Sequence, residues 1–186
     1  MTASEIEALG AVVETDRGSL PFALIHGEAL VACATWALDE AGVTPLDLTV
    51  PWSAVVEAEE PYVLHDPLCP MTPAGFIARC VETAVERDVV VVAVRPVTDT
   101  VKTLADGLVG DTLDREQLVE VTSPIVLPAA VVAQLDAPPG GDFAALAAEL
   151  AARFPVTTVT APPEARRVAS VDDLRLLEAL TAPQRG

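Results

Sequence analysis

The stretch Val89 to Lys102, VVVVAVRPVTDTVK, decides the fold class of this 186-residue chain. Its first six residues are apolar and mostly β-branched, and Pro96 follows closely, so the run is too short for a helix and is typical of a buried strand. A strand that is apolar on both faces is typical of a parallel sheet covered by helices. We therefore expect an α/β protein.

Polar residues follow this strand at its carboxyl end, and they include Thr98, Asp99, Thr100 and Lys102, the only lysine of the chain. In an open α/β sheet, ligands bind at the carboxyl ends of the strands. The alternative is an ordinary solvated loop after a core strand, and this stretch alone favours that alternative.

The charge of the chain limits its partners. There are 28 acidic residues against 11 basic ones, a formal net charge of −17, so a nucleic acid would be repelled from most faces. A small anionic ligand can still bind where arginines converge. No apolar run approaches the ~20 residues of a membrane span, and the acidic N-terminus, MTASEIEALG, is not a signal peptide. We expect one domain over residues 1–186, in a cytoplasmic enzyme or binding protein.

Cysteine and histidine are too few to organise the fold. The three cysteines, Cys33, Cys69 and Cys80, have no CxxC spacing, and the two histidines are His26 and His65. This argues against a disulfide framework and against a zinc site. A metal held through Asp66 stays open as an alternative.

Hydrophobic periodicity and turn residues predict the other elements. Strands are expected over residues 11–13, 46–50, 62–64 and 156–160, and helices over residues 30–41, after Thr72-Pro73, from Pro128 to Leu135, after Asp142 and after Ser170. Residues 97–113 alternate around Asp106-Gly107, which predicts a β-hairpin that projects from the body as a dimerisation arm. Thr122-Ser123-Pro124 is expected to break the chain.

The first loop, residues 14–19 with the sequence ETDRGS, is a poor phosphate-binding loop. A phosphate cradle needs several small residues so that backbone N–H groups can approach the anion. Here there is one glycine, and the carboxylates of Glu14 and Asp16 would oppose a phosphate. Arg17 is the only side chain of the loop that would help.

Five segments in order resemble the motifs of one family. They are YVLHD at residues 62–66 with Pro70 ("V-L-V-H-D-A-A-R-P"), PVTDTVK at residues 96–102 ("P-V-x-D-T-[IVM]-K"), TLDREQL at residues 112–118 ("T-[VL]-D-R-x-x-L"), TSP at residues 122–124 ("Q-T-P-Q") and residues 168–174 ("V-T-x-P-E-D-L"). Each motif is weak alone, but five in register from about residue 61 to the end are specific. The chain resembles the 2-C-methyl-D-erythritol 4-phosphate cytidylyltransferase family.

The resemblance implies a Rossmann-like nucleotidyltransferase fold of the GT-A type, with an arm at about residues 97–113 that forms a homodimer and reaches the partner's site. It implies transfer of CMP from CTP to methylerythritol phosphate in non-mevalonate isoprenoid biosynthesis, with magnesium. The family's sugar-phosphate contacts fall on Asp66, Thr100, Arg115, Ser123 and Arg167, and Asp66 is also the candidate magnesium ligand. Ser123 replaces a threonine, and Arg167 replaces a lysine.

The chain departs from the family's pattern at the positions that the family uses to bind and activate the nucleotide. Phe22 stands where the family has its catalytic lysine, Cys69 replaces an arginine, and the base-recognising segment is reduced to residues 51–61. Arg17 is the one candidate replacement for a catalytic cation. Phosphoryl transfer depends on positioning and electrostatic stabilisation, and most of those groups are missing here.

Three functions therefore compete. One is an active cytidylyltransferase that uses Arg17 and a partner subunit. The second, which we favour, is a divergent member that keeps the fold, the dimer arm and an anionic sugar-phosphate pocket, with weak or no CTP transfer. The third is a non-catalytic interaction protein.

Overall fold

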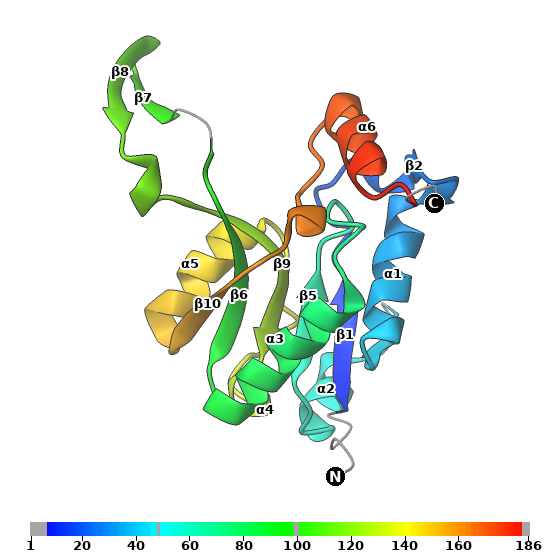
Figure 1. Ribbon diagram of the computed structural model, residues 1–186. Coiled ribbons are helices and arrows are strands. Elements are labelled where there is room, and N and C mark those ends of the chain that lie inside the picture. Colours follow the sequence, from blue (N-terminus) through cyan, green and yellow to red (C-terminus); the bar gives the residue numbers. More distant parts are fainter. Residues whose placement is uncertain (1–6, 48, 99–100, 184–186) are drawn as a thin grey trace.

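A six-stranded sheet forms the centre of the computed structural model, which describes residues 7–47, 49–98 and 101–183 (Figure 1). Its strand order is β10-β6-β9-β5-β1-β4, with β1 at Ala8–Val12, β4 at Val43–Pro45, β5 at Tyr62–His65, β6 at Val90–Pro96, β9 at Val119–Leu127 and β10 at Val156–Thr160. Five strands run parallel, whereas β9 runs antiparallel to its neighbours β5 and β6. The expected α/β, Rossmann-like fold is confirmed.

Helices cover both faces of this sheet. They are α1 (Leu30–Glu40), α2 (Trp52–Glu57), α3 (Ala74–Arg87), α4 (Ala129–Val132), α5 (Phe143–Arg153) and α6 (Val171–Leu180), with short 3₁₀ turns η1 (Leu20–Phe22), η2 (Arg115–Gln117) and η3 (Pro163–Ala165). In β6, Val91 packs with α1 and α3, whereas Val90 and Val92 pack with α2, α4 and α5 on the other face. The central strand is therefore buried on both sides, as its unbroken apolar run predicts.

The prediction that Thr122-Ser123-Pro124 interrupts the secondary structure is wrong, because these residues lie within β9. The strand continues through these residues, because Val92 pairs with Ile125 and Val94 with Val121. One residue of β6 thus lies opposite three residues of β9, so Pro124, which has no N–H to donate, sits in a bulge rather than in the regular ladder. A bulge also redirects side chains, and the hydroxyls of Thr122 and Ser123 are used in the site described below.

Two boundaries differ from expectation near the first helices. The predicted strand at residues 46–50 is wrong, because β4 begins immediately after Gly42, whose φ of 79° ends α1, and is already complete at Pro45. Thr72 is not the N-cap of α3 either. The cap is Pro73, and the Thr72 hydroxyl donates to the Cys69 carbonyl instead.

A β-hairpin projects from the body where one is expected (Figure 1). It consists of β7 (Val101–Ala105) and β8 (Leu108–Leu113), joined at Asp106 and Gly107, whose φ angles of 50° and 77° suit a two-residue hairpin turn. A second, short hairpin pairs β2 (Leu24–Ile25) with β3 (Glu28–Ala29) and contacts α6. Among the described residues, no helix is both long enough and apolar enough to cross a bilayer.

Candidate functional site

Asp66, which directly follows β5, is the centre of a buried charge cluster. Its Oδ1 lies 3.0 Å from Nε of Arg17, and its Oδ2 lies 3.1 Å from Nε of Arg167. The backbone N–H of Leu68 also donates to Oδ1, at 2.9 Å. Arg17 comes from the loop after β1 and Arg167 from the segment before α6, so the cluster joins three distant parts of the chain. Residues that the sequence predicts for the site therefore meet at this carboxylate.

Arg17 is engaged at every nitrogen of its guanidinium group. Besides the ion pair through Nε, Nη1 donates to the Thr15 carbonyl at 2.9 Å and Nη2 to the Gly141 carbonyl at 2.8 Å. The guanidinium carbon lies 5.6 Å from the centroid of the Phe143 ring, and the residue is only 8% exposed. Arg17 thus ties the loop after β1 to the loop before α5, and it faces the protein rather than solvent.

Ser123 supports Asp66 from within the core. Its hydroxyl accepts a hydrogen bond from the Asp66 backbone N–H at 2.9 Å and is also bonded to Nδ1 of His65. The side chain is fully buried. In this structure Ser123 therefore positions the end of β5 and presents no hydroxyl to solvent. The adjacent Thr122 donates to the Ala165 carbonyl at 2.7 Å, which holds η3 against β9.

His65 and Cys69 are buried beside this cluster. Burial lowers the pKa of His65 to about 4, although the neighbouring Asp66 charge acts in the opposite direction, so the ring is neutral at pH 7. Its Nε2 has no hydrogen-bond partner among the described residues. Burial, and secondarily Asp66, raises the pKa of Cys69 to about 12, which makes it a poor nucleophile. Neither residue is arranged for proton or group transfer.

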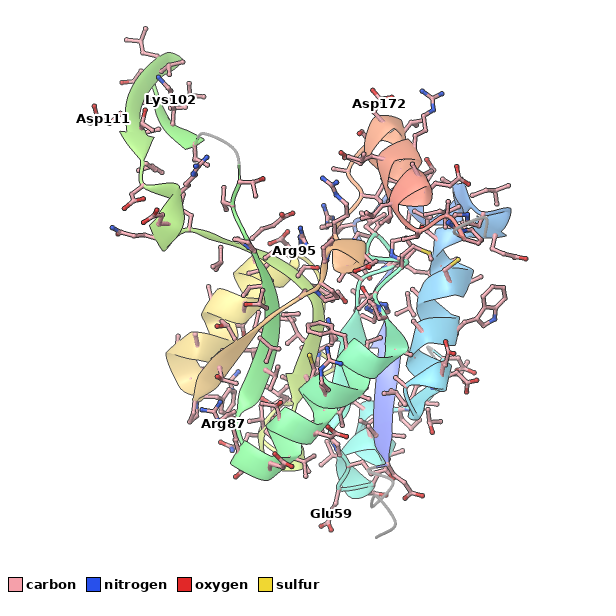
Figure 2. All side chains as sticks on the ribbon, in the orientation of Figure 1. Glu59, Arg87, Arg95, Lys102, Asp111 and Asp172 are labelled. Atoms are coloured by element: carbon pink, nitrogen blue, oxygen red, sulfur yellow. The ribbon has the colours of Figure 1, made fainter. Side chains whose placement is uncertain are left out.

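Other predicted site residues lie elsewhere. Arg115 belongs to η2 at the base of the arm, where its Nη1 donates to the Thr98 carbonyl at 2.9 Å. Thr100 lies outside the described residues. Phe22, in the position of the family's lysine, is 61% exposed on η1. Lys102 is on the arm with Asp111, away from the body (Figure 2).

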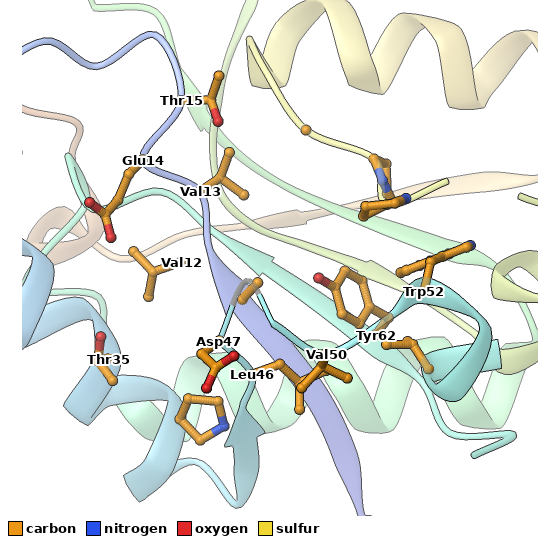
Figure 3. Close-up of a pocket in the computed structure, with 16 residues that line it drawn as sticks. Val12, Val13, Glu14, Thr15, Thr35, Leu46, Asp47, Val50, Trp52 and Tyr62 are labelled. Carbon is orange, nitrogen blue, oxygen red and sulfur yellow. The ribbon is translucent and has the colours of Figure 1, made fainter. Parts of the chain in front are cut away.

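A cavity of about 530 Å³ opens at the carboxyl ends of β1 and β4, and sequence reasoning did not identify it (Figure 3). It is lined by Ala11, Val12, Val13, Glu14, Thr15, Thr35, Pro45, Leu46, Asp47, Val50, Trp52, Val55, Tyr62, Pro138, Pro139 and Gly140. Trp52 and Val55 come from residues 51–61, the segment to which the motif resemblance assigns base recognition, and they line part of this cavity. The rule that ligands bind at the carboxyl ends of strands points to this place, but loop 138–140 comes from too far along the sequence to be assigned to it.

Magnesium does not fit the side chains at Asp66. Both carboxylate oxygens already accept from guanidinium groups, and the two cations beside them would repel a divalent ion. Within the described ranges, no group of three or more histidine, cysteine, aspartate or glutamate side chains is placed to hold a metal ion.

Comparison with known proteins gives one consistent result. The family model described as 2-C-methyl-D-erythritol 4-phosphate cytidylyltransferase matches residues 49–181. Curated proteins of that name are 31% identical over 170 residues in Corynebacterium diphtheriae and 36% identical over 103 residues in Corynebacterium glutamicum. These alignments cover 87% and 54% of this chain, but only 64% and 37% of the relatives' own lengths.

Solved structures of proteins with these names share the fold of this chain. The cytidylyltransferase of this name from Thermus thermophilus superposes with a TM-score of 0.68 at 23% identity, covering 93% of this chain and 97% of that one. A 4-diphosphocytidyl-2C-methyl-D-erythritol synthase from Anaerococcus prevotii gives 0.65 at 12% identity, covering 96% and 99%. At these identities, the superpositions show a shared fold.

Proposed function

The chain belongs to the 2-C-methyl-D-erythritol 4-phosphate cytidylyltransferase family, and we propose that it is a divergent member that binds an anionic sugar phosphate beside Asp66 but does not transfer CMP from CTP. Under this proposal the protein is a pseudoenzyme that keeps the fold, the sugar-phosphate side of the site and the dimer arm.

The position of Arg17 is the observation that carries this proposal. Transfer to a phosphate requires cations that are free to meet charge developing on the transferred group. Arg17 is the only basic residue of the first loop, and all three of its nitrogens are engaged within the protein. Phe22 supplies no charge, while Glu14 and Asp16 add negative charge to the same loop. A triphosphate would therefore meet carboxylates and no available cation there.

Arg167 supports the retained sugar-phosphate site. Only its Nε is used by Asp66, and its side chain is 33% exposed, so the two Nη groups remain available to an anion from solvent. Arginine can bind a phosphate through two parallel hydrogen bonds. We propose that Arg115, carried by the partner's arm, supplies a second cation to this site.

The homodimer in this proposal is formed by residues 97–113. Leu104, Leu108 and Val109 on the hairpin are all exposed, with Leu108 at 74%. A projecting hairpin with exposed apolar side chains is typical of a segment that is buried in an assembly. In such a dimer, Arg115 at the base of the hairpin would lie at the site of the neighbouring subunit.

Pyrophosphate release from CTP and methylerythritol phosphate, with magnesium in the buffer, tests the loss of transfer. We expect no turnover above background, with the Corynebacterium diphtheriae relative as positive control. Turnover near ~1 s⁻¹, in the ordinary enzyme range, would show that the protein is an active cytidylyltransferase and would refute the proposal. If that turnover disappeared in Arg17→Ala, Arg17 would be identified as the catalytic cation.

Calorimetry with methylerythritol phosphate tests the retained site separately. We expect Arg167→Ala to weaken binding by about 1.5–3 kcal/mol, as for a lost charge-assisted hydrogen bond. Arg87→Ala is the matched control, because Arg87 is an exposed arginine at the end of α3 that contacts Thr157. Absence of any binding would instead favour an interaction protein without a ligand site.

A further inference from the structure

The two edges of the central sheet differ in how they are protected (Figure 1). Strand β4 at one edge has only three residues and ends at Pro45, which has no N–H to donate. Strand β10 at the other edge has five residues with the sequence VTTVT, all of them β-branched and uncharged. Natural edge strands usually carry a charge, a proline or a bulge, because an open edge pairs readily with another chain. Strand β10 has none of these features.

Every second residue of β10 directs its backbone groups away from the sheet. At the end of the strand, the Ala161 N–H donates to the Val94 carbonyl of β6 at 2.8 Å, so the odd-numbered residues of this segment face β6. Backbone groups alternate from side to side along a strand. The N–H and C=O groups that face the open edge therefore belong to Val156, Thr158 and Thr160. Within the part of the chain that the structure describes, β6 is the only strand that pairs with β10.

The surroundings of β10 are close to neutral, unlike the rest of the chain. Residues 149–167, which contain the strand, hold two glutamates and three arginines, whereas the formal net charge of the chain is −17. Beside the strand, Arg87 at the end of α3 donates to the Thr157 hydroxyl at 3.2 Å, and the acidic Asp88 is next to it. Most faces of this protein would repel a second copy of the chain. The edge at β10 is a place where that repulsion is small.

The sequence of β10 is complementary to itself when two copies run antiparallel. With Thr158 on a two-fold axis, Thr158 of each copy lies opposite Thr158 of the other, Val156 lies opposite Thr160, and Thr157 lies opposite Val159. The residues with free backbone groups then face one another, and each such pair exchanges both of its N–H···O bonds. The central threonine pair adds a cross-strand contact of a kind that stabilises sheets.

We infer that β10 pairs antiparallel with β10 of a second copy of this chain, about a two-fold axis at Thr158. The contact is isologous, since the same surface is used on both copies. Arg153 precedes the strand and Glu164 follows it, so antiparallel pairing brings each arginine toward Glu164 of the partner subunit. Opposite charges thus meet at both ends of the paired strands.

The small size of this contact sets the concentration at which it forms. Two five-residue strands bury less than the ~1,200 Å² of a stable specific interface. We expect pairing at roughly 0.1–1 mM protein and none at micromolar concentration. The contact is separate from the arm and does not depend on the proposed function. In a protein that is already dimeric through the arm, it joins dimers to one another.

Sedimentation equilibrium at ~5 µM and ~500 µM protein measures this association. We expect the weight-average mass to rise at least about 1.3-fold over this range, as mass action requires for a dissociation constant of about 1 mM or less. A variant with Leu104→Ser, Leu108→Ser and Val109→Ser should show a similar relative rise from its own lower mass. This result would separate pairing at β10 from dimerisation through the arm.

Charge at residue 158 tests both the partner and the register. Thr158 is exposed, so Thr158→Lys and Thr158→Glu should leave the fold unchanged, which circular dichroism verifies. Because residue 158 lies opposite itself, each variant alone places like charges face to face and should lose the rise in mass. An equimolar mixture of the two variants should regain it, because opposite charges then face each other. Thr158→Val is the matched control and should associate like the wild-type protein.

Three outcomes would overturn the inference. They are a wild-type mass that stays constant over this concentration range, a singly charged variant that associates as well as the wild-type protein, and an equimolar mixture that does not associate. None of these results bears on CTP turnover or on binding of methylerythritol phosphate, so failure of this inference is distinguishable from failure of the proposed function.

Discussion

Asp66 is the residue on which the site depends, because it neutralises a nearly inaccessible arginine. Removing one partner of a buried ion pair leaves the other charge uncompensated, which costs about 3–5 kcal/mol. We expect Asp66→Asn to lower the free energy of unfolding by an amount in this range, measured by urea denaturation.

The matched control for this prediction is Asp172→Asn. Asp172 pairs with Arg175 at 3.3 Å, but both side chains are largely exposed, and such pairs contribute about 0–1 kcal/mol. If the two variants lost similar stability, the Arg17–Asp66 pair would not be acting as a buried pair.

His65 makes stability depend on pH in a defined window. Its pKa is lowered from 6.5 to about 4 in the folded protein, so the unfolded chain binds one more proton between those values. The stabilisation from keeping the ring neutral is fully present above about pH 6.5 and is lost progressively as pH falls toward 4. At 1.36 kcal/mol per pKa unit, it is on the order of 3 kcal/mol.

We expect the free energy of unfolding to fall more steeply between pH 7 and pH 4.5 in the wild-type protein than in a His65→Gln variant. The difference in slope corresponds to the uptake of up to one additional proton on unfolding. Urea unfolding at several pH values measures this difference. Carboxylates contribute to the slope in both proteins and cancel in the comparison. Parallel profiles for the two proteins would show that His65 does not titrate in this way.

The arm is the element whose role is easiest to isolate. Its apolar side chains are exposed, so replacing them should leave the fold of the body unchanged. We expect Leu104→Ser, Leu108→Ser and Val109→Ser together to convert a dimer into a monomer, as measured by light scattering after size-exclusion chromatography.

Leu176→Ser with Leu180→Ser serves as the control for the arm variant. These residues are also exposed and apolar, but they lie on α6. This control protein should remain dimeric. A wild-type protein that is monomeric at micromolar concentration would contradict the proposed role of the arm.

Charge acts at the scale of the whole molecule. With 28 acidic and 11 basic residues, the compact state is destabilised by self-repulsion, and salt screens repulsion between exposed charges. We expect the thermal unfolding midpoint to rise when NaCl is increased from about 0.02 M to about 0.5 M. Circular dichroism measures it, and a midpoint that falls over this range would show that attractive surface pairs outweigh the repulsion.

The sequence alone predicts the layers of this fold. The unbroken apolar run at the central strand, the stripe along α3 and the Asp106-Gly107 turn are each local patterns, and each element forms where its pattern lies. The α/β class follows because side-chain periodicity is set by backbone geometry, which is the same in every protein. The motif resemblance likewise indicates the family that the comparisons show.

Only the tertiary structure decides how distant segments meet. Pro124 and its neighbours suggest a break, but a bulge opposite Ala93 lets β9 pass between β5 and β6, and no local pattern encodes that pairing. Arg17 could equally have faced a ligand. It faces Asp66, Gly141 and Phe143 instead, because the end of β5 and the segment at the start of α5 lie around it once the sheet has assembled. The cavity has the same origin, since its wall joins residues 11–15 to residues 138–140, and a hollow exists only where such surfaces are brought together without filling the space between them.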